Sequence, residues 1–217
     1  MLQLLPPRGI RAILSGECSS LSRPGGNCTG VSSLNVEVGP KRLECLHEVI
    51  PPATTFAVVL NPVSPTANSQ LNSLEAAAEA RGLKLVVLHA TTQQEFEPLF
   101  KRFCELGAGG LVFTSDPVFA FRSDQLAALA ARYAVPAITQ SRDFPLAGGL
   151  MSYGGDFVQS HREAGVYAGR ILKGEKPSEL PVQRVTNVEL FVNLKTARSF
   201  GLTVPPGLLA RADEVIE

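Results

Sequence analysis

The 217-residue sequence has no tryptophan, only three tyrosines, and no excess of either charge. Its twenty lysines and arginines are balanced by twenty aspartates and glutamates. A protein that binds nucleic acid usually presents a basic surface with aromatic side chains for base stacking, so the composition argues against that class. No apolar run approaches the roughly 18 residues that a membrane-spanning helix needs. We therefore expect a globular protein of one large or two small domains that binds neither nucleic acid nor a membrane surface.

The motifs of the common catalytic and cofactor-binding classes are also missing. No GxGxxG follows a predicted strand, and GxxxxGK[ST], GxSxG and HExxH do not occur. The four cysteines form no CxxC pair, and only His47 lies near one of them, two residues after Cys45. We therefore predict no metal, no cofactor and no catalytic residue. A Cys18–Cys28 disulfide would depend on the redox state of the compartment, which the sequence leaves open.

What the sequence does contain is 45% hydrophobic residues arranged in alternating strand and helix patterns. Phe56–Leu60 is an unbroken apolar run that ends at Asn61-Pro62, as a strand buried on both faces of a parallel sheet would. Strands that alternate with helices predict an α/β fold with a doubly wound, mostly parallel sheet. The predicted strands are 10–14, 56–60, 83–88, 111–113, 135–139, 150–153 and 188–192. The predicted helices begin near Pro40, Thr66, Thr92, Ser123, Asp156, Lys195 and Pro205, the last running to Glu217.

Local signals support several of these elements. Thr92 and Glu95 have the spacing of a capping box, and Ser123 is placed to cap the helix that follows it. The stripe of Phe96, Leu99, Phe100, Phe103 and Leu106 has helical spacing and predicts a face packed in the core.

Polar residues follow the predicted strands, at the edge of a parallel sheet where ligands bind in such folds. We predict a ligand site formed by Asn61, Ser64, Asp116, Arg142 and Tyr153. Asp116 would accept a hydrogen bond from an ammonium group, Arg142 would bind a carboxylate, and Tyr153 would supply an apolar wall. The alternative is that these residues only end strands and cap helices. A second alternative is a small α/β enzyme that uses His89 or Asp116 as acid or base.

Several motifs resemble those of ABC-transporter substrate-binding proteins of the tryptophan/tyrosine type. The motifs are LSRPGGNCTG at Leu21–Gly30, GGLMSYG at Gly148–Gly154, LKGEKP at Leu172–Pro177, NLKTA at Asn193–Ala197, GLTVPP at Gly201–Pro206, and LLARADEVIE at Leu208–Glu217. The resemblance covers nearly the whole chain from residue 10. It implies the type I periplasmic-binding-protein fold, a small ligand such as an aromatic amino acid, ABC permease subunits as partners, and no catalysis.

The resemblance also implies that most of a first lobe is lacking. Residues 1–29 would be a remnant of that lobe and hinge, and 30–154 the second lobe. Residues 155–186 would be a helix and linker that normally pack on the first lobe, and 187–217 a return strand and C-terminal helices. Such proteins close two lobes on a ligand, so a fragment that binds nothing is a further alternative.

The resemblance has two further consequences. Apolar surface that the first lobe would cover should be exposed, which predicts association with another copy of the chain or low stability. The family is periplasmic; the sequence as written shows no signal peptide, which predicts a cytoplasmic location if it is expressed in this form.

Overall fold

The structure is a computed structural model that describes residues 20–217, so the predicted strand 10–14 lies outside the described residues. The chain divides into two compact units. Unit 1 comprises residues 1–34 and 155–188, and unit 2 comprises residues 35–154 and 189–217. The chain therefore passes between the units three times, at 34–35, 154–155 and 188–189. The assignment of these units to the lobes of a larger protein stays a prediction.

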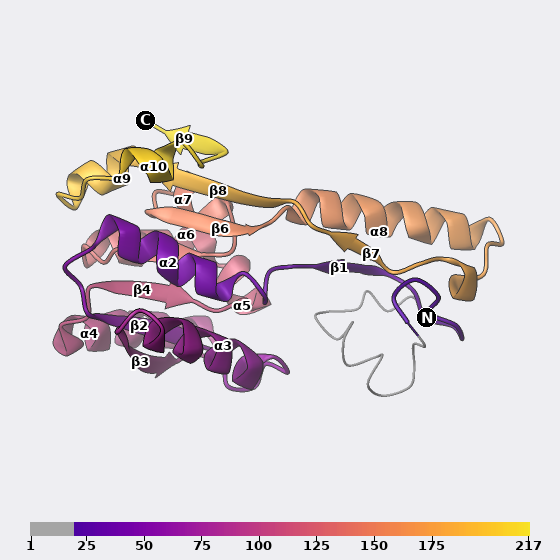
Figure 1. The fold of residues 1–217 in the computed structure, drawn as a ribbon, viewed down its shortest axis with the longest axis horizontal. Coiled ribbons are helices and arrows are strands. Elements are labelled where there is room, and N and C mark those ends of the chain that lie inside the picture. Colours follow the sequence, from indigo (N-terminus) through magenta and orange to yellow (C-terminus); the bar gives the residue numbers. More distant parts are fainter. Residues whose placement is uncertain (1–19) are drawn as a thin grey trace. The chain divides into compact units, whose positions relative to one another are not determined.

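Unit 2 is built on a seven-stranded sheet with the strand order β3-β2-β4-β5-β6-β8-β9 (Figure 1). The described pairings β2–β3, β2–β4, β4–β5, β5–β6 and β8–β9 are all parallel, as predicted. The strands are β2 Thr55–Leu60, β3 Lys84–His89, β4 Gly110–Phe113, β5 Ala137–Thr139, β6 Met151–Gly155, β8 Val188–Asn193 and β9 Glu214–Ile216.

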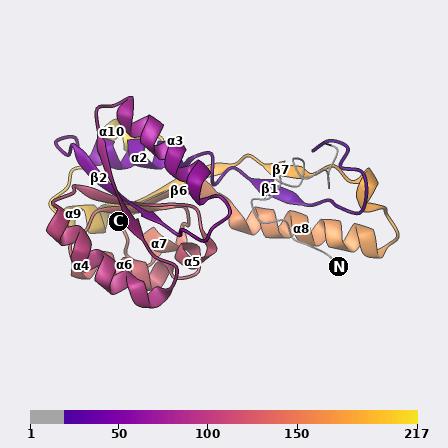
Figure 2. The same ribbon diagram turned by 90° about the horizontal axis from the view of Figure 1, so that it is seen from below.

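Helices cover both faces of this sheet (Figure 2). Helices α2, α3 and α10 lie on one face, and α4, α6 and α7 lie on the other. No described helix has the length and apolar character needed to cross a membrane. The helices and 3-10 turns of unit 2 are α2 Gly39–Val49, α3 Ala67–Glu79, η1 Gln93–Glu95, α4 Phe96–Leu106, α5 Pro117–Ala120, α6 Ser123–Arg132, α7 Asp143–Leu146, α9 Leu194–Ser199 and α10 Pro206–Leu209.

The two faces carry separate hydrophobic clusters because side chains alternate along each strand. In β2, Phe56 and Val58 join the cluster under α2 and α3, whereas Ala57 and Val59 join the cluster under α4 and α6. The predicted aromatic stripe of α4 is confirmed as core: Phe96 and Phe100 are 0% exposed. The predicted capping box of Thr92 and Glu95 is also confirmed.

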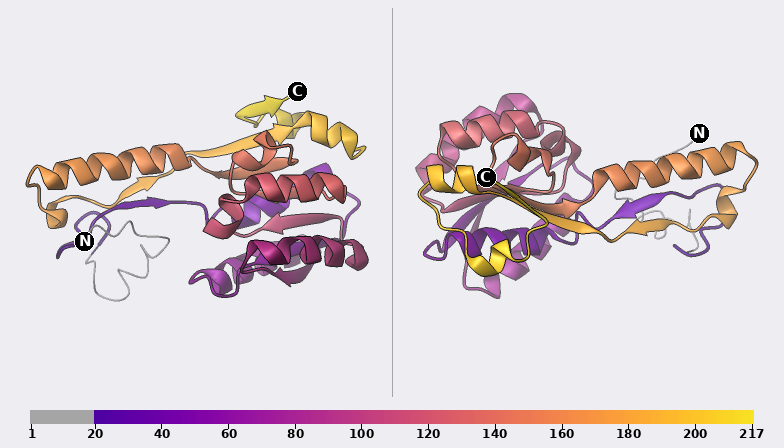
Figure 3. Two further views of the ribbon diagram at one scale, coloured as in Figure 1. Left: turned by 180° about the vertical axis from the view of Figure 1, so that it is seen from behind. Right: turned by 90° about the horizontal axis from the view of Figure 1, so that it is seen from above.

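Unit 1 is smaller in its described part. It contains the two-stranded parallel sheet of β1 Val31–Ser33 and β7 Gln183–Val185, the helix α8 Phe157–Leu172 and the turn η2 Pro177–Glu179. Figure 3 shows α8 running beside the two strands. Three large apolar side chains of α8, those of Val158, Val166 and Leu172, are exposed.

Three sequence predictions are corrected by the structure. The tail from Pro205 is not one helix, because the short α10 ends at Leu209 and β9 then adds to the sheet edge. Ser123 does not cap α6; it is the first helical residue, and its Oγ donates to the carbonyl of Ala120. The short strands β1 and β7 were not predicted at all.

Candidate functional site

The parallel pairing of β2 and β4 brings Asn61 and Asp116 together at the carboxyl edge of the sheet. Nδ2 of Asn61 donates to Oδ2 of Asp116 over 3.1 Å. Both side chains are buried, at 6% and 4% exposure. The structure thus joins two of the predicted ligand residues directly, from positions 55 residues apart in the chain.

The remaining bonds of this pair fix its orientation. Oδ1 of Asp116 accepts from the backbone N–H of Val118 at 2.9 Å, so Asp116 caps the short helix α5. Oδ1 of Asn61 accepts from the N–H of Val63 at 3.2 Å. A carboxylate has about four acceptor positions, and these contacts use two of them. Among the described residues, no cation pairs with Asp116.

A buried glutamine holds the residue before Asp116. The backbone N–H of Ser115 donates to Oε1 of Gln70 at 2.6 Å, and Nε2 of Gln70 donates to the carbonyl of Ser115 at 3.0 Å. Gln140, at the end of β5, donates more weakly to the carbonyl of Asp116 at 3.4 Å. The backbone at the end of β4 is therefore fixed from two neighbouring elements.

Arg42, on α2, is a further buried polar side chain at this edge, with 0% exposure. Its Nη2 donates to the carbonyl of Asn35 at 2.9 Å and to Oγ of Ser115 at 2.8 Å, and its Nη1 donates to the carbonyl of Tyr153 at 3.1 Å. Nε has no hydrogen-bond partner among the described residues. Burial lowers the pKa of Arg42 to about 10 because desolvation disfavours the charged form.

Sequence reasoning missed both Arg42 and Gln70, although helical spacing carries the signal. Arg42 stands four and seven residues before Leu46 and Val49, on the buried face of α2. Gln70 stands four and eight residues before Leu74 and Ala78, on the buried face of α3. A polar residue in register with a core stripe must find partners inside the protein.

The side chains of Ser64 and Arg142 do not bond to those of Asn61 and Asp116, although the backbone N–H of Ser64 donates to the carbonyl of Asn61 at 3.1 Å. Oγ of Ser64 lies 3.3 Å from Oγ1 of Thr66 in the loop after β2. Nη1 of Arg142 lies 3.8 Å from a carboxylate oxygen of Glu189, a long and partly exposed ion pair. Arg142 follows β5, at the same edge of the sheet.

The side chain of Tyr153 lies elsewhere than predicted. Alternation along β6 places it on the same face as Met151, where it packs against the hydrophobic cluster under α2. Its pKa is raised by burial and by the nearby Cys45. The structure therefore does not bring its ring together with Asp116, and the contribution of Tyr153 to this edge is its backbone carbonyl. His89, the acid or base of the enzyme alternative, is exposed at the end of β3.

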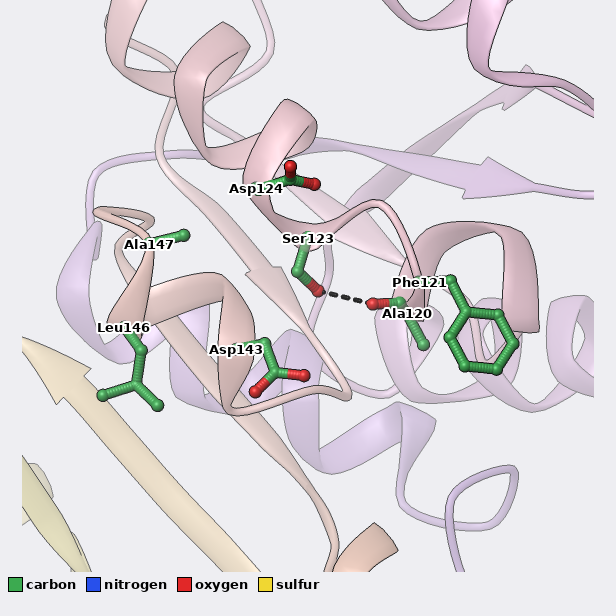
Figure 4. Close-up of a pocket in the computed structure, with 7 residues that line it drawn as sticks. All are labelled: Ala120, Phe121, Ser123, Asp124, Asp143, Leu146 and Ala147. Atoms are coloured by element: carbon green, nitrogen blue, oxygen red, sulfur yellow. Dashed lines mark hydrogen bonds between the residues drawn. The ribbon is translucent and has the colours of Figure 1, made fainter.

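A separate open depression of about 430 Å³ lies among α5, α6 and α7 (Figure 4). Asp124 and Asp143 line it together with the apolar side chains of Phe121 and Leu146. None of the five predicted ligand residues lines this depression. Within residues 20–217, no group of three or more His, Cys, Asp or Glu side chains could hold a metal ion.

The sequence and the structure of the chain were compared with those of known proteins. The family described as "ABC transporter substrate binding protein" matches residues 11–216. The chain belongs to this family. No curated protein matches the chain.

The fold of the substrate-binding protein matches those of several solved structures. A conserved domain protein from Vibrio cholerae matches with a TM-score of 0.81 and 25% identity. An ABC domain from Streptococcus pneumoniae in complex with L-Trp matches with a TM-score of 0.81 and 23% identity. The ligand-free, open form of a substrate-binding protein with adhesive properties from Clostridium difficile matches with a TM-score of 0.64 and 24% identity. Each match covers 94% of this chain and 68% of the other chain. The predicted type I periplasmic-binding-protein fold is confirmed.

Proposed function

We propose that this substrate-binding protein delivers a small, amino-acid-like ligand to an ABC importer and performs no catalysis. The observation that carries the proposal is the Asp116 carboxylate. It is buried at the carboxyl edge of a parallel sheet, is oriented by Asn61 and Val118, and keeps free acceptor positions. A primary ammonium group is the ligand feature that matches such a carboxylate.

The other predicted residues take supporting roles in this proposal. Arg142 binds the ligand carboxylate, since its pair with Glu189 is long at 3.8 Å and can be exchanged for a shorter one. Ser64 adds a hydroxyl beside Asn61. Tyr153 contributes through its backbone, and the apolar wall for an aromatic ligand comes from another residue. The neighbour from Streptococcus pneumoniae in complex with L-Trp supports an aromatic amino acid as the ligand.

The rest of the site is proposed to come from residues outside this sequence. This chain covers 68% of the length of two related structures, and the remainder of those proteins has no counterpart in this sequence. In the proposed mechanism, the first lobe, most of which lies outside this sequence, closes over the ligand held at Asp116, and the closed protein docks on permease subunits outside the cytoplasm.

Calorimetry with a pair of ligands tests the proposal. L-Tryptophan carries an ammonium group, whereas indole-3-propionate has the same ring and carboxylate without it. We expect saturable heat with L-tryptophan and a loss of affinity of about tenfold or more in Asp116→Asn, because a charge-assisted hydrogen bond is removed. The affinity for indole-3-propionate, already weak, should not fall in the same variant.

Asp124→Asn is the matched control, because it removes an exposed carboxylate from the neighbouring depression and should leave both affinities unchanged. Absence of heat with every amino acid in a panel would support the fragment alternative. Conversion of the ligand, followed by NMR, would support the enzyme alternative. An equal loss of affinity for both ligands in Asp116→Asn would contradict the ammonium role.

A homo-oligomer is part of the proposal for the chain as written. The exposed side chains of Val158, Val166 and Leu172 form an apolar surface on α8 that a partner would bury.

A further inference from the structure

The side chain of Arg42 forms hydrogen bonds next to two of the three places where the chain passes between the units. Asn35 is the first residue of unit 2 after the first passage, and Tyr153 stands two residues before Gly155, where unit 1 resumes. The guanidinium of Arg42 donates to the carbonyls of both residues, at 2.9 and 3.1 Å. The three described hydrogen bonds of Arg42 go to Asn35, Ser115 and Tyr153, and none of them goes to the third passage, at 188–189.

The same guanidinium also reaches the candidate ligand edge. Nη2 of Arg42 donates to Oγ of Ser115 at 2.8 Å, and that hydroxyl donates in turn to the carbonyl of Asn35 at 2.5 Å. Ser115 directly precedes Asp116, and Gln70 holds its backbone on both sides. A short hydrogen-bonded path therefore runs from Asp116 through Ser115 and Arg42 to both passages.

Stability alone does not account for this arrangement. Arg42 is fully buried, no carboxylate pairs with it among the described residues, and its Nε has no partner. Taking an unpaired charge out of water is costly, and apolar side chains of similar volume often serve a core as well or better. What the guanidinium supplies, and an apolar side chain does not, is a planar donor set that holds several oxygens at once.

We propose that Arg42 is a positioning residue that couples the ligand edge at Ser115–Asp116 to the passages at Asn35 and Tyr153. Movement of Asp116 on ligand binding is transmitted through the Ser115 hydroxyl and the guanidinium to the backbone where the units join. The link itself stands on the hydrogen bonds, and its role in ligand-driven closure rests on the proposed function.

A double-mutant cycle followed by hydrogen exchange tests the link without any ligand. Arg42→Lys keeps the charge but loses the planar fork, and Ser115→Ala removes the hydroxyl. Each should raise exchange about tenfold in peptides spanning 34–38 and 152–156, because a hydrogen bond to a charged group is lost. The double variant should exchange no faster than the faster single variant, because both changes break one path.

Thr114→Val is the matched control. It removes the buried hydroxyl of the adjacent residue, which donates to the carbonyl of Val59 and not to the Arg42 path. This variant should leave the two passage peptides unchanged and should combine additively with Arg42→Lys. The peptide spanning 187–190 is an internal control, since it should not respond to either Arg42→Lys or Ser115→Ala. If Arg42→Lys fails to fold, the comparison of Ser115→Ala with Thr114→Val decides the question.

Equal exchange in Ser115→Ala and Thr114→Val would overturn the link. A second arm adds L-tryptophan, which should protect the passage peptides in the wild-type chain and protect them less in Ser115→Ala. If L-tryptophan binds but protects neither passage, the coupling is wrong while the proposed function stands. If no amino acid binds the wild-type chain, the proposed function fails, and the ligand-free cycle still decides whether Arg42 holds the passages.

Discussion

Units 1 and 2 differ in how completely their sheets are covered. In unit 2 the residues of β4 and β5 are buried throughout, because helices cover both faces of the sheet. In the described part of unit 1, a two-stranded sheet has one helix beside it, and two of the three residues of β7 are exposed. Unit 2 can therefore bury polar groups such as Arg42 and Asp116 in fixed positions, whereas the one helix of the described part of unit 1 carries three exposed large apolar side chains.

The largest expected effect concerns this exposed apolar surface. Val166→Lys combined with Leu172→Lys should weaken self-association at least about tenfold, since burying each such side chain contributes about 1.5–3 kcal/mol. Sedimentation velocity over a range of concentrations measures the change. Phe121→Lys is the control, because it alters an exposed apolar side chain of unit 2 and should leave association as it was. A wild-type chain that is monomeric at every concentration would refute the proposed oligomer.

Replacing a glycine by alanine should change the free energy of unfolding in opposite directions in the two units. A Cβ on Gly154 would lie 2.1 Å from the backbone oxygen of Gln140, so Gly154→Ala should destabilise unit 2 by about 1–3 kcal/mol. A Cβ on Gly165, in α8, would meet nothing within 4 Å, so Gly165→Ala should stabilise the helix by about 0.5–1 kcal/mol. Urea unfolding followed by circular dichroism measures both changes. Destabilisation by Gly165→Ala would show that α8 is packed more closely than the structure has it.

The same contrast explains how much of the fold was predictable. Long elements with one strong pattern, such as Phe56–Leu60 and the stripe of α4, were predicted because burial on one or both faces determines their sequence. The three-residue strands β1, β7 and β9 were not, because so short a segment has no readable period; β5, of the same length, was predicted because all of its residues are buried and it follows a helix in the alternating pattern. The tail shows the reason: Asp213 accepts from the backbone N–H of Leu190, so pairing with β8 decides its structure and local propensity does not.

The candidate site was predictable only in part. Strand ends indicated Asn61 and Asp116 correctly as neighbours, since parallel strands bring their carboxyl ends to one edge. The side chain of Tyr153 lies on the face of the sheet that also carries Met151. Side chains two residues apart in a strand share a face, so the burial of Met151 would have indicated the face of Tyr153. Arg42 and Gln70 were missed because helix faces are predicted from apolar residues alone, although the spacing of both residues places them in the core stripe.

The smallest expected effect compares one exposed glutamate in each unit. Backbone N–H groups of Thr91 and Thr92 donate to Glu95 and lower its pKa, and the Arg170 side chain does the same for Glu175 in unit 1. A lowered folded-state pKa stabilises the fold above the unfolded value of about 4.3 and ceases to do so as pH falls through the folded value. Glu95→Gln and Glu175→Gln should therefore each lower the urea midpoint slightly near pH 7, and neither should do so at acidic pH.

High salt should affect the two substitutions differently. The Glu175 contact is an exposed ion pair, whereas the Glu95 contact is a capping hydrogen bond from the backbone. In about 1 M salt, where the screening length is about 3 Å, the effect of Glu175→Gln should disappear and that of Glu95→Gln should persist. Glu79→Gln, at the end of α3, is the control for removing an exposed charge. Equal sensitivity of both effects to salt would mean that the Glu95 contact acts through long-range charge and not through the N–H groups it accepts from.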